Sequence, residues 1–130
     1  MLNLHSFKKE FLKTNFDYYL VNTNDEFLNE YTPSSSMKLK WLTNFSGSNG
    51  MALVGKKKNY FFTDGRYTLQ AKKEIDSSFK ILEIPKINFF DFAKDNLVGK
   101  NILLDFKTFN YKFLERLIKI TCNKNKGIEH

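Results

Sequence analysis

Two apolar runs separated by three lysines constrain the fold of this chain more than any other feature. The runs are Met-Ala-Leu-Val-Gly at 51–55 and Asn-Tyr-Phe-Phe-Thr at 59–63, with Lys56, Lys57 and Lys58 between them. Short apolar runs joined by a polar turn are typical of neighbouring β-strands. The sequence therefore predicts a hairpin whose turn carries the lysines.

Further apolar runs predict more strands, and segments with apolar residues at helical spacing predict helices. The expected strands are residues 17–22, 79–84 and 101–106, and the expected helices are residues 4–12, 38–45, 67–75, 88–96 and 111–122. Residues 24–36 are polar, contain Pro33, and are expected to form a long loop. Alternating strands and helices predict an α/β domain with a mixed sheet covered by helices.

Length and composition indicate one globular domain. The chain has 130 residues, of which 42% are hydrophobic and 27% are charged, and these values suit a single core. No repeat, linker or low-complexity segment divides the sequence. We therefore expect one domain over residues 1–128, with residues 129–130 set apart as an expression remnant.

The positive charge of the chain points to a lysine-rich surface. The net charge is +7, from 21 basic and 14 acidic residues, but only Arg66 and Arg116 among the basic residues are arginines. Phosphate clamps and base readers favour the planar arginine fork. We therefore expect no nucleic-acid partner, and a stand-alone basic interaction or nucleic-acid-binding module is the alternative hypothesis.

Cysteine use and the terminal sequence indicate a cytoplasmic protein with no membrane partner. The lone Cys122 lies in an apolar run, so a buried inert thiol in a reducing compartment is expected. The N-terminus has no unbroken apolar segment typical of a signal peptide. No stretch of the sequence approaches the length of a membrane span.

The sequence lacks the usual groups for hydrolysis. The histidines are His5 and His130, at opposite ends of the chain, so neither a metal cluster nor a nucleophilic triad can be assembled from sequence spacing. Scattered acids on separate elements could in principle hold two Mg²⁺ ions, as in two-metal nucleases, which is a third hypothesis. Those acids are Asp64, Asp76, Asp91 and Asp105.

Three sequence blocks carry a family resemblance. They are Asp-Glu-Phe-Leu-Asn-Glu-Tyr-Thr-Pro at 25–33, Trp-Leu-Thr-Asn-Phe-Ser-Gly-Ser-Asn-Gly-Met-Ala-Leu-Val at 41–54, and Phe-Phe-Thr-Asp-Gly-Arg-Tyr-Thr-Leu-Gln-Ala-Lys-Lys-Glu-Ile-Asp at 61–76. Together, in this order and spacing, they closely resemble the N-terminal domain of Xaa-Pro aminopeptidases, also called the creatinase/prolidase N-terminal domain. The resemblance covers residues 7–117.

The resemblance implies a mixed, roughly six-stranded sheet flanked by helices, ribonuclease-H-like in shape. It also implies a separate C-terminal catalytic domain of pita-bread shape, outside this sequence, with two divalent metals, usually manganese. No catalytic residue, metal ligand or cofactor is then expected in these residues. The implied whole enzyme is a metallopeptidase that removes an N-terminal residue preceding proline from short peptides. This domain would help to build a homo-oligomer and the active-site entrance.

The chain departs from the family pattern at two positions. Phe27 stands where the family commonly has His, which would remove a polar contact at the entrance. Asn44 replaces a glycine, and asparagine tolerates the left-handed backbone conformation better than most residues.

The turn at Asp64, Gly65 and Arg66 has two interpretations. In the structural one, which we favour, Asp64 caps the following helix, Gly65 allows a tight backbone, and Arg66 pairs with an internal carboxylate. In the functional one, the Arg66 fork lies at a substrate channel and holds a peptide carboxylate.

Three further residues are candidates for the entrance or a subunit contact. Glu30 and Tyr31 lie in the acidic block, and the alternative there is a loop anchored by a buried Tyr31. For Trp41, the single tryptophan, core packing is favoured over a substrate wall.

Overall fold

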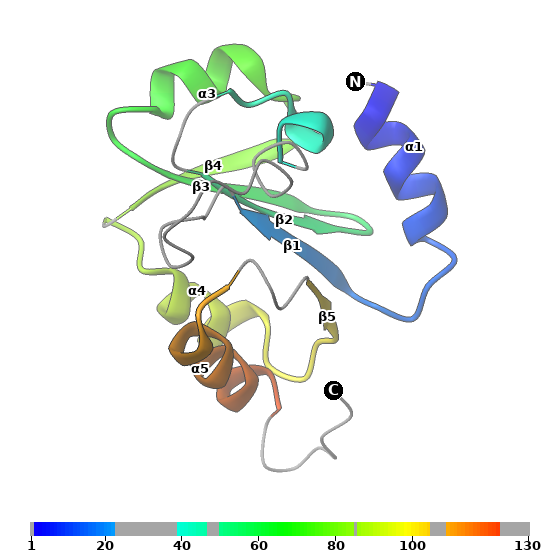
Figure 1. Ribbon diagram of the computed structural model, residues 1–130, viewed down its shortest axis with the longest axis vertical. Coiled ribbons are helices and arrows are strands. Elements are labelled where there is room, and N and C mark those ends of the chain that lie inside the picture. The colour runs from blue at the N-terminus through cyan, green and yellow to red at the C-terminus, as the bar shows by residue number, and fades with distance from the viewer. Residues whose placement is uncertain (1, 23–38, 47–49, 85, 105–108, 123–130) are drawn as a thin grey trace.

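A five-stranded mixed sheet with helices on both faces forms the described part of the chain (Figure 1). The structure is a computed structural model that describes residues 2–22, 39–46, 50–84, 86–104 and 109–122. The strand order is β4-β3-β2-β1-β5. The strands are β1 (Tyr18–Asn22), β2 (Met51–Gly55), β3 (Asn59–Asp64), β4 (Phe79–Ile84) and β5 (Ile102–Leu103).

The predicted hairpin lies at the centre of this sheet. β2 pairs antiparallel with both β1 and β3, whereas β4 pairs parallel with β3 and β5 pairs parallel with β1. The strands β1, β3, β4 and β5 therefore point in one direction and β2 points in the other. The turn between β2 and β3 is the lysine segment, in which Lys57 and Lys58 are exposed as expected.

Helices cover both faces of the sheet. They are α1 (Leu2–Phe11), α3 (Thr68–Glu74), α4 (Phe89–Asn96) and α5 (Tyr111–Thr121), with a further helical segment over residues 39–43. Asn88 and Asn110 cap α4 and α5, since each side-chain oxygen accepts a backbone N–H of the first turn. Within the described residues, no helix is long and apolar enough to cross a bilayer.

Neighbouring residues of the central strands are buried in opposite cores because side chains alternate across a strand. Phe61 packs in a core with residues of α1, α3 and the 39–43 segment, and Phe62 packs in a second core with residues of α4 and α5. Both phenylalanines are fully buried. This double burial explains why the strands read as continuous apolar runs instead of alternating ones.

The lysine turn also holds the end of α1 in place. The Lys56 ammonium donates to the carbonyl oxygen of Thr14 at 2.6 Å and lies 5.9 Å from the centre of the Phe11 ring. Lys56 therefore combines a hydrogen bond to the turn that follows α1 with a cation–π contact to the last residue of α1. This lysine links the hairpin to the first helix, which the sequence pattern did not reveal.

Most expected elements are confirmed, with differences at their ends. The α/β class and the mixed sheet are confirmed, and the described residues form five strands where the resemblance implied roughly six. The expected strand over 101–106 is paired only at Ile102–Leu103, and residues 105–108 lie outside the described part. Cys122 is buried, as expected, and His5 is exposed on α1.

The position of Gly55 at the end of β2 yields a first test. A Cβ at Gly55 would lie 2.6 Å from Cε1 of Tyr18 and 2.7 Å from the backbone oxygen of Lys58. Relieving the second clash would require the backbone to move, which costs more free energy than moving a flexible side chain. We expect Gly55→Ala to lower the free energy of unfolding by about 1–3 kcal/mol, the usual cost of overpacking. Urea denaturation should show this loss, while Lys57→Ala in the same turn should leave the midpoint unchanged. Equal midpoints for both variants would contradict the packing described here.

Candidate functional site

The ends of three strands bring the sequence blocks to one edge of the sheet. The register places Asn22, Met51 and Phe62 side by side across β1, β2 and β3. Neighbouring strands lie about 4.8 Å apart, so the segments that adjoin these residues start close together. We call this edge the motif edge and define it by Asn22, Gly50 and Asp64.

Each block adjoins the motif edge through its position in the chain. The block at 25–33 follows Asn22 closely, the block at 41–54 enters β2 through Gly50, and the block at 61–76 leaves β3 through Asp64. Gly50 is required here because a Cβ would lie 2.7 Å from Cζ of Phe61 and 3.0 Å from Cε2 of Phe45. The described residues Gly50 and Asp64 of two of these blocks thus lie at the end of the sheet where the carboxyl ends of four strands lie.

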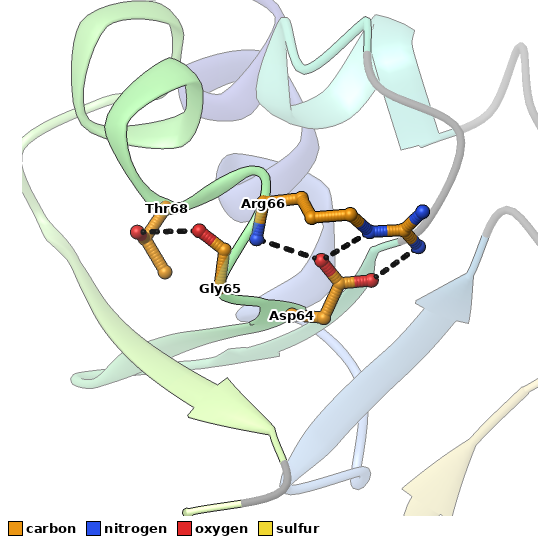
Figure 2. A network of polar contacts seen from close by, with 4 residues as sticks. All are labelled: Asp64, Gly65, Arg66 and Thr68. Carbon is orange, nitrogen blue, oxygen red and sulfur yellow. Dashed lines mark hydrogen bonds and ion pairs between the residues drawn. The ribbon is translucent and has the colours of Figure 1, made fainter.

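The Asp64–Tyr67 turn connects β3 to α3 (Figure 2). The Tyr67 backbone N–H donates to the Asp64 carbonyl oxygen at 3.0 Å, and the Arg66 backbone N–H donates to Oδ1 of Asp64 at 2.9 Å. The Arg66 guanidinium folds back onto the same carboxylate, with Nε 3.2 Å from Oδ1 and Nη2 2.9 Å from Oδ2. This is a bidentate arginine–carboxylate pair within one turn.

The expected roles of Asp64 and Arg66 need correction. Asp64 does not cap α3, which begins at Thr68 without a side-chain cap, because the Asp64 oxygens accept from Arg66 instead. Arg66 pairs with a carboxylate as expected, but the pair is not internal, since the Arg66 side chain is 76% exposed. Gly65 has no left-handed backbone; its missing side chain leaves room for the Glu83 carboxylate, which a Cβ would approach at 2.9 Å.

The exposed guanidinium remains able to bind a second anion. Asp64 raises the pKa of Arg66 above its ordinary value, first through the side-chain hydrogen bond and then through charge, so Arg66 is a permanent cation. The Arg66 guanidinium also lies 5.4 Å from the centre of the Tyr67 ring. Because the fork has five N–H donors and Asp64 uses those on Nε and Nη2, donors remain that point to solvent.

A second network ties the block at 41–54 to α3. The Glu74 carboxylate accepts from the Ser46 backbone N–H at 2.8 Å and from the Ser46 hydroxyl at 2.9 Å. Gln70 donates to Glu74 Oε2 at 3.2 Å and to the Ser46 hydroxyl oxygen at 3.0 Å. These bonds lower the pKa of Glu74 below its ordinary value, chiefly through the backbone N–H of Ser46. We call Ser46, Gln70 and Glu74 the serine clamp.

Asn44 completes the connection between these elements. Its backbone φ is 70°, so the expectation that asparagine would accept the left-handed conformation is confirmed. Its side-chain amide donates to the Glu74 carbonyl oxygen at 3.1 Å. An asparagine therefore supplies both the backbone conformation and an extra contact to α3 that a glycine could not make.

Sequence reasoning missed the serine clamp, although a signal for it was present. Gln70 and Glu74 are four residues apart, so they face the same side of a helix. Ser46 lies in a different sequence block, 24 residues before Gln70. Their contact could not be deduced from spacing, because it depends on how the chain returns through β2 and β3.

Trp41 does not pack in the core, so the favoured expectation is wrong. Its side chain is 50% exposed, while Leu39 and Leu42 of the same helical segment are fully buried. A short helix buries one face only, and the two leucines occupy that face. Glu30, Tyr31 and Phe27 lie outside the described residues, so their expected roles stay predictions.

The acids of the two-metal hypothesis have other contacts in the structure. Within the described residues, no group of three or more histidines, cysteines or acids comes together that could hold a metal ion. Asp64 is held by Arg66, and the Asp76 carboxylate accepts from the Ser78 backbone N–H at 2.8 Å. Asp105, another acid of that hypothesis, lies outside the described residues.

The fold and the motif edge define a helix-flanked mixed-sheet domain that presents a cation and an exposed aromatic group. A match to the creatinase/prolidase N-terminal domain family covers residues 5–127. The chain therefore belongs to this family. It is 34% identical over 90 residues to a probable Xaa-Pro aminopeptidase P of Coprinopsis cinerea, a match covering 67% of this chain and 14% of that protein.

Solved structures give the same result for the fold. The X-prolyl aminopeptidase of Caenorhabditis elegans, a cytosolic enzyme with a di-nuclear active site, superposes with a TM-score of 0.69 at 29% identity, over 80% of this chain and 18% of that chain. The Xaa-Pro aminopeptidase of Streptococcus thermophilus gives a TM-score of 0.67 at 26% identity, over 92% of this chain and 83% of that chain. The chain spans 12–14% of the length of the curated relatives it matches.

The serine clamp predicts a specific pH dependence. Because the pKa of Glu74 is lowered on folding, its stabilisation is complete above the unfolded pKa of about 4.3 and is lost as pH falls through the lower folded value. We expect Glu74→Gln to destabilise the domain at pH 7 by about 0.5–1 kcal/mol, a figure reduced for solvent exposure. The difference in free energy of unfolding between Glu74→Gln and wild type should disappear in acid. Urea titrations at pH 7 and pH 3 measure this difference, with Glu115→Gln as the control.

Proposed function

We propose that this chain is the non-catalytic N-terminal domain of a metal-dependent Xaa-Pro aminopeptidase, and that its motif edge helps to control which peptides reach the active site. Membership of the creatinase/prolidase N-terminal family supports the first part. The length of the relatives supports a larger parent protein, since they extend far beyond the matched region. In this proposal the catalytic groups and two metal ions, with manganese the expected metal, belong to a C-terminal domain.

The observation that carries the proposal is that the blocks at 41–54 and 61–76 reach the motif edge side by side, with Met51 paired to Phe62. Hydrogen bonds hold polar residues of both blocks in place, since the serine clamp fixes Ser46 and the Asp64 pair fixes Arg66. Ligand sites in open α/β sheets favour the carboxyl ends of strands.

Arg66 is the residue we assign to the peptide. Its guanidinium is exposed but held at two points by Asp64, so little side-chain entropy is lost when it binds another anion. A short peptide of the Xaa-Pro class ends in a carboxylate, which can accept hydrogen bonds from the remaining N–H donors of the guanidinium. Half-exposed Trp41 is assigned to a contact with another subunit or domain, consistent with the enrichment of tryptophan at interfaces.

The first experiment compares this 130-residue chain with the full-length product of its gene. Both proteins are incubated with manganese and a tripeptide that has proline in second place, and release of the first amino acid is measured. We expect release by the full-length protein only. Activity of the 130-residue chain alone, or an inactive but folded full-length protein, would contradict the proposal.

Replacing Arg66 separates binding from stability. Arg66→Lys keeps the charge but loses the fork, and the pair with Asp64 is solvent-exposed, so we expect no measurable change in melting temperature of the isolated domain. In the full-length enzyme we expect KM for the tripeptide to rise about tenfold with kcat nearly constant, as for lost uniform binding. Lys72→Arg on α3 serves as the control. A large fall in melting temperature would instead assign Arg66 a structural role.

A further inference from the structure

Exposed lysines gather at the end of the sheet opposite the motif edge. The strands β1, β3, β4 and β5 begin at this end, and the turn between β2 and β3 lies among them because β2 runs in the opposite direction. We call this region the lysine end and define it by its exposed lysines, which are Lys13, Lys57, Lys58, Lys80 and Lys100. These residues are far apart in the sequence, so the fold brings them together.

Contacts between neighbouring segments place these lysines on one surface. Lys13 lies next to the β2–β3 turn, since the carbonyl oxygen of the adjoining Thr14 accepts from the Lys56 ammonium at 2.6 Å. The start of β4 lies next to the start of β3, since the Asn59 side-chain amide donates to the Ser78 hydroxyl oxygen at 3.0 Å. The lysines of the turn, of β4 and of the segment after α1 therefore face the same side of the domain.

The same end continues across the sheet to β5. The Asn101 N–H donates to Oδ2 of Asp17 at 2.7 Å, so Lys100 lies beside the residue that precedes β1. Neighbouring strands lie about 4.8 Å apart, so the five strands spread the lysines over about 19 Å. A row of cations along the whole end of a sheet suits an extended, flat partner better than a small ligand, which needs a concave site.

The acids at this end leave most of its lysines unpaired. Asp17 and Asp76 each accept a backbone N–H, at 2.7 and 2.8 Å, and Glu10 pairs with Lys13 at 3.5 Å. Asp95 on α4 is balanced by the lysine that precedes it. Within the described residues the other salt bridges belong to other parts of the domain, so four lysines of this end take part in none. A positive potential that attracts anions therefore covers the lysine end.

Two exposed aliphatic side chains accompany these lysines. Leu12, directly after α1, is 58% exposed, and Val98, in the turn before β5, is 41% exposed. The exposed aromatic side chains of the described residues lie elsewhere, with Trp41 beside the start of α1 and Tyr111 at the start of α5. Long lysine stems with exposed aliphatic tips between them suit the interface of a lipid bilayer.

We propose that the lysine end is a docking surface for a membrane that contains anionic lipids. In the bound state the ammonium groups contact the lipid phosphates and carboxylates, and Leu12 and Val98 enter the boundary of the hydrocarbon layer. The proposal does not rest on the proposed function, because the motif edge lies at the other end of the sheet. The same arrangement leaves the motif edge open to peptides while the domain is bound.

This docking surface differs from the expected absence of a membrane partner. That expectation rested on a sequence without a membrane span or a signal peptide, and a peripheral contact needs neither. The sequence did not reveal the surface, because its five lysines come from four separate segments that meet only in the folded chain.

The residue types at this end favour lipid over nucleic acid or protein. Nucleic-acid sites combine arginine forks with stacking aromatic rings, and the lysine end is defined by neither. The buried centres of protein interfaces are depleted in lysine. An anionic bilayer, in contrast, is attracted by point charges near its surface and accepts a few apolar tips.

Co-sedimentation with lipid vesicles provides the test. The 130-residue chain and the full-length product of its gene are each mixed with vesicles of phosphatidylcholine, with or without phosphatidylserine. We expect both proteins to bind only the vesicles that contain phosphatidylserine. Binding should be lost in about 1 M sodium chloride, where the Debye length is about 3 Å. Absence of binding at low salt, or equal binding to phosphatidylcholine alone, overturns the proposal.

Charge-neutralising variants test whether the lysine end makes the contact. Lys57→Gln combined with Lys58→Gln should raise the dissociation constant for phosphatidylserine vesicles by about tenfold or more, since each lysine near an anionic surface adds to the affinity. The matched control is Lys86→Gln combined with Lys112→Gln, which removes the same charge from exposed positions before α4 and in the first turn of α5. The control should change the dissociation constant by less than about twofold. Equal losses in the two variants would show attraction by net charge alone and overturn the docking surface.

Two leucines of similar exposure test the apolar part of the contact. Leu12 and Leu69 are 58% and 61% exposed, and Leu69 lies in the first turn of α3, away from the lysine end. Leu12→Ser should weaken vesicle binding by about threefold or more, whereas Leu69→Ser should leave it unchanged. Both positions are exposed, so both variants should keep the melting temperature of the unchanged chain.

The remaining outcomes separate lipid from other partners and this proposal from the proposed function. Vesicle binding by the 130-residue chain but not by the folded full-length protein shows that another domain covers the lysine end, and overturns the proposal. A DNA duplex that binds as tightly as the vesicles, with no effect of Leu12→Ser, assigns the lysine end to nucleic acid and also overturns it. Vesicle binding by a full-length protein that does not cleave the tripeptide supports this proposal and contradicts the proposed function alone.

Discussion

The simultaneous burial of Phe61 and Phe62 on opposite faces of β3 is the constraint on which the rest of the structure depends. Each ring is fully buried in its own core, so the central hairpin cannot form without a helix layer on both sides. Edge-to-face contacts extend from these rings, at 4.8 Å between the ring centres of Phe45 and Phe61 and 5.2 Å between those of Phe62 and Phe89. Removing one buried phenylalanine ring typically costs about 3–5 kcal/mol.

The directions of the strands explain how the sheet brings the residues of the motif edge together. Because β1 and β3 are parallel to each other with antiparallel β2 between them, the segments after β1, before β2 and after β3 share one end of the sheet. The serine clamp and the Asp64–Arg66 pair then fix two of these segments by charge-assisted hydrogen bonds. Such bonds are directional, so they position side chains more than they stabilise the fold.

The two outermost strands of the sheet, β4 and β5, differ in the extent of their pairing. β4 pairs along its whole length with β3, over six residue pairs, whereas β5 pairs with β1 over two. Within the described residues, an apolar groove of about 600 Å³ lies beside this short strand and α5.

The sequence by itself determined the α/β class, the central hairpin and the left-handed conformation of Asn44. These features are local, because they depend on residue type, on the spacing of apolar residues along the sequence and on nearest neighbours in the chain. Tertiary structure decided the exposure of Trp41 and the contact of Ser46 with Gln70 and Glu74. Ser46 and Glu74 are separated by two strands, so only the packing of the folded chain brings them together.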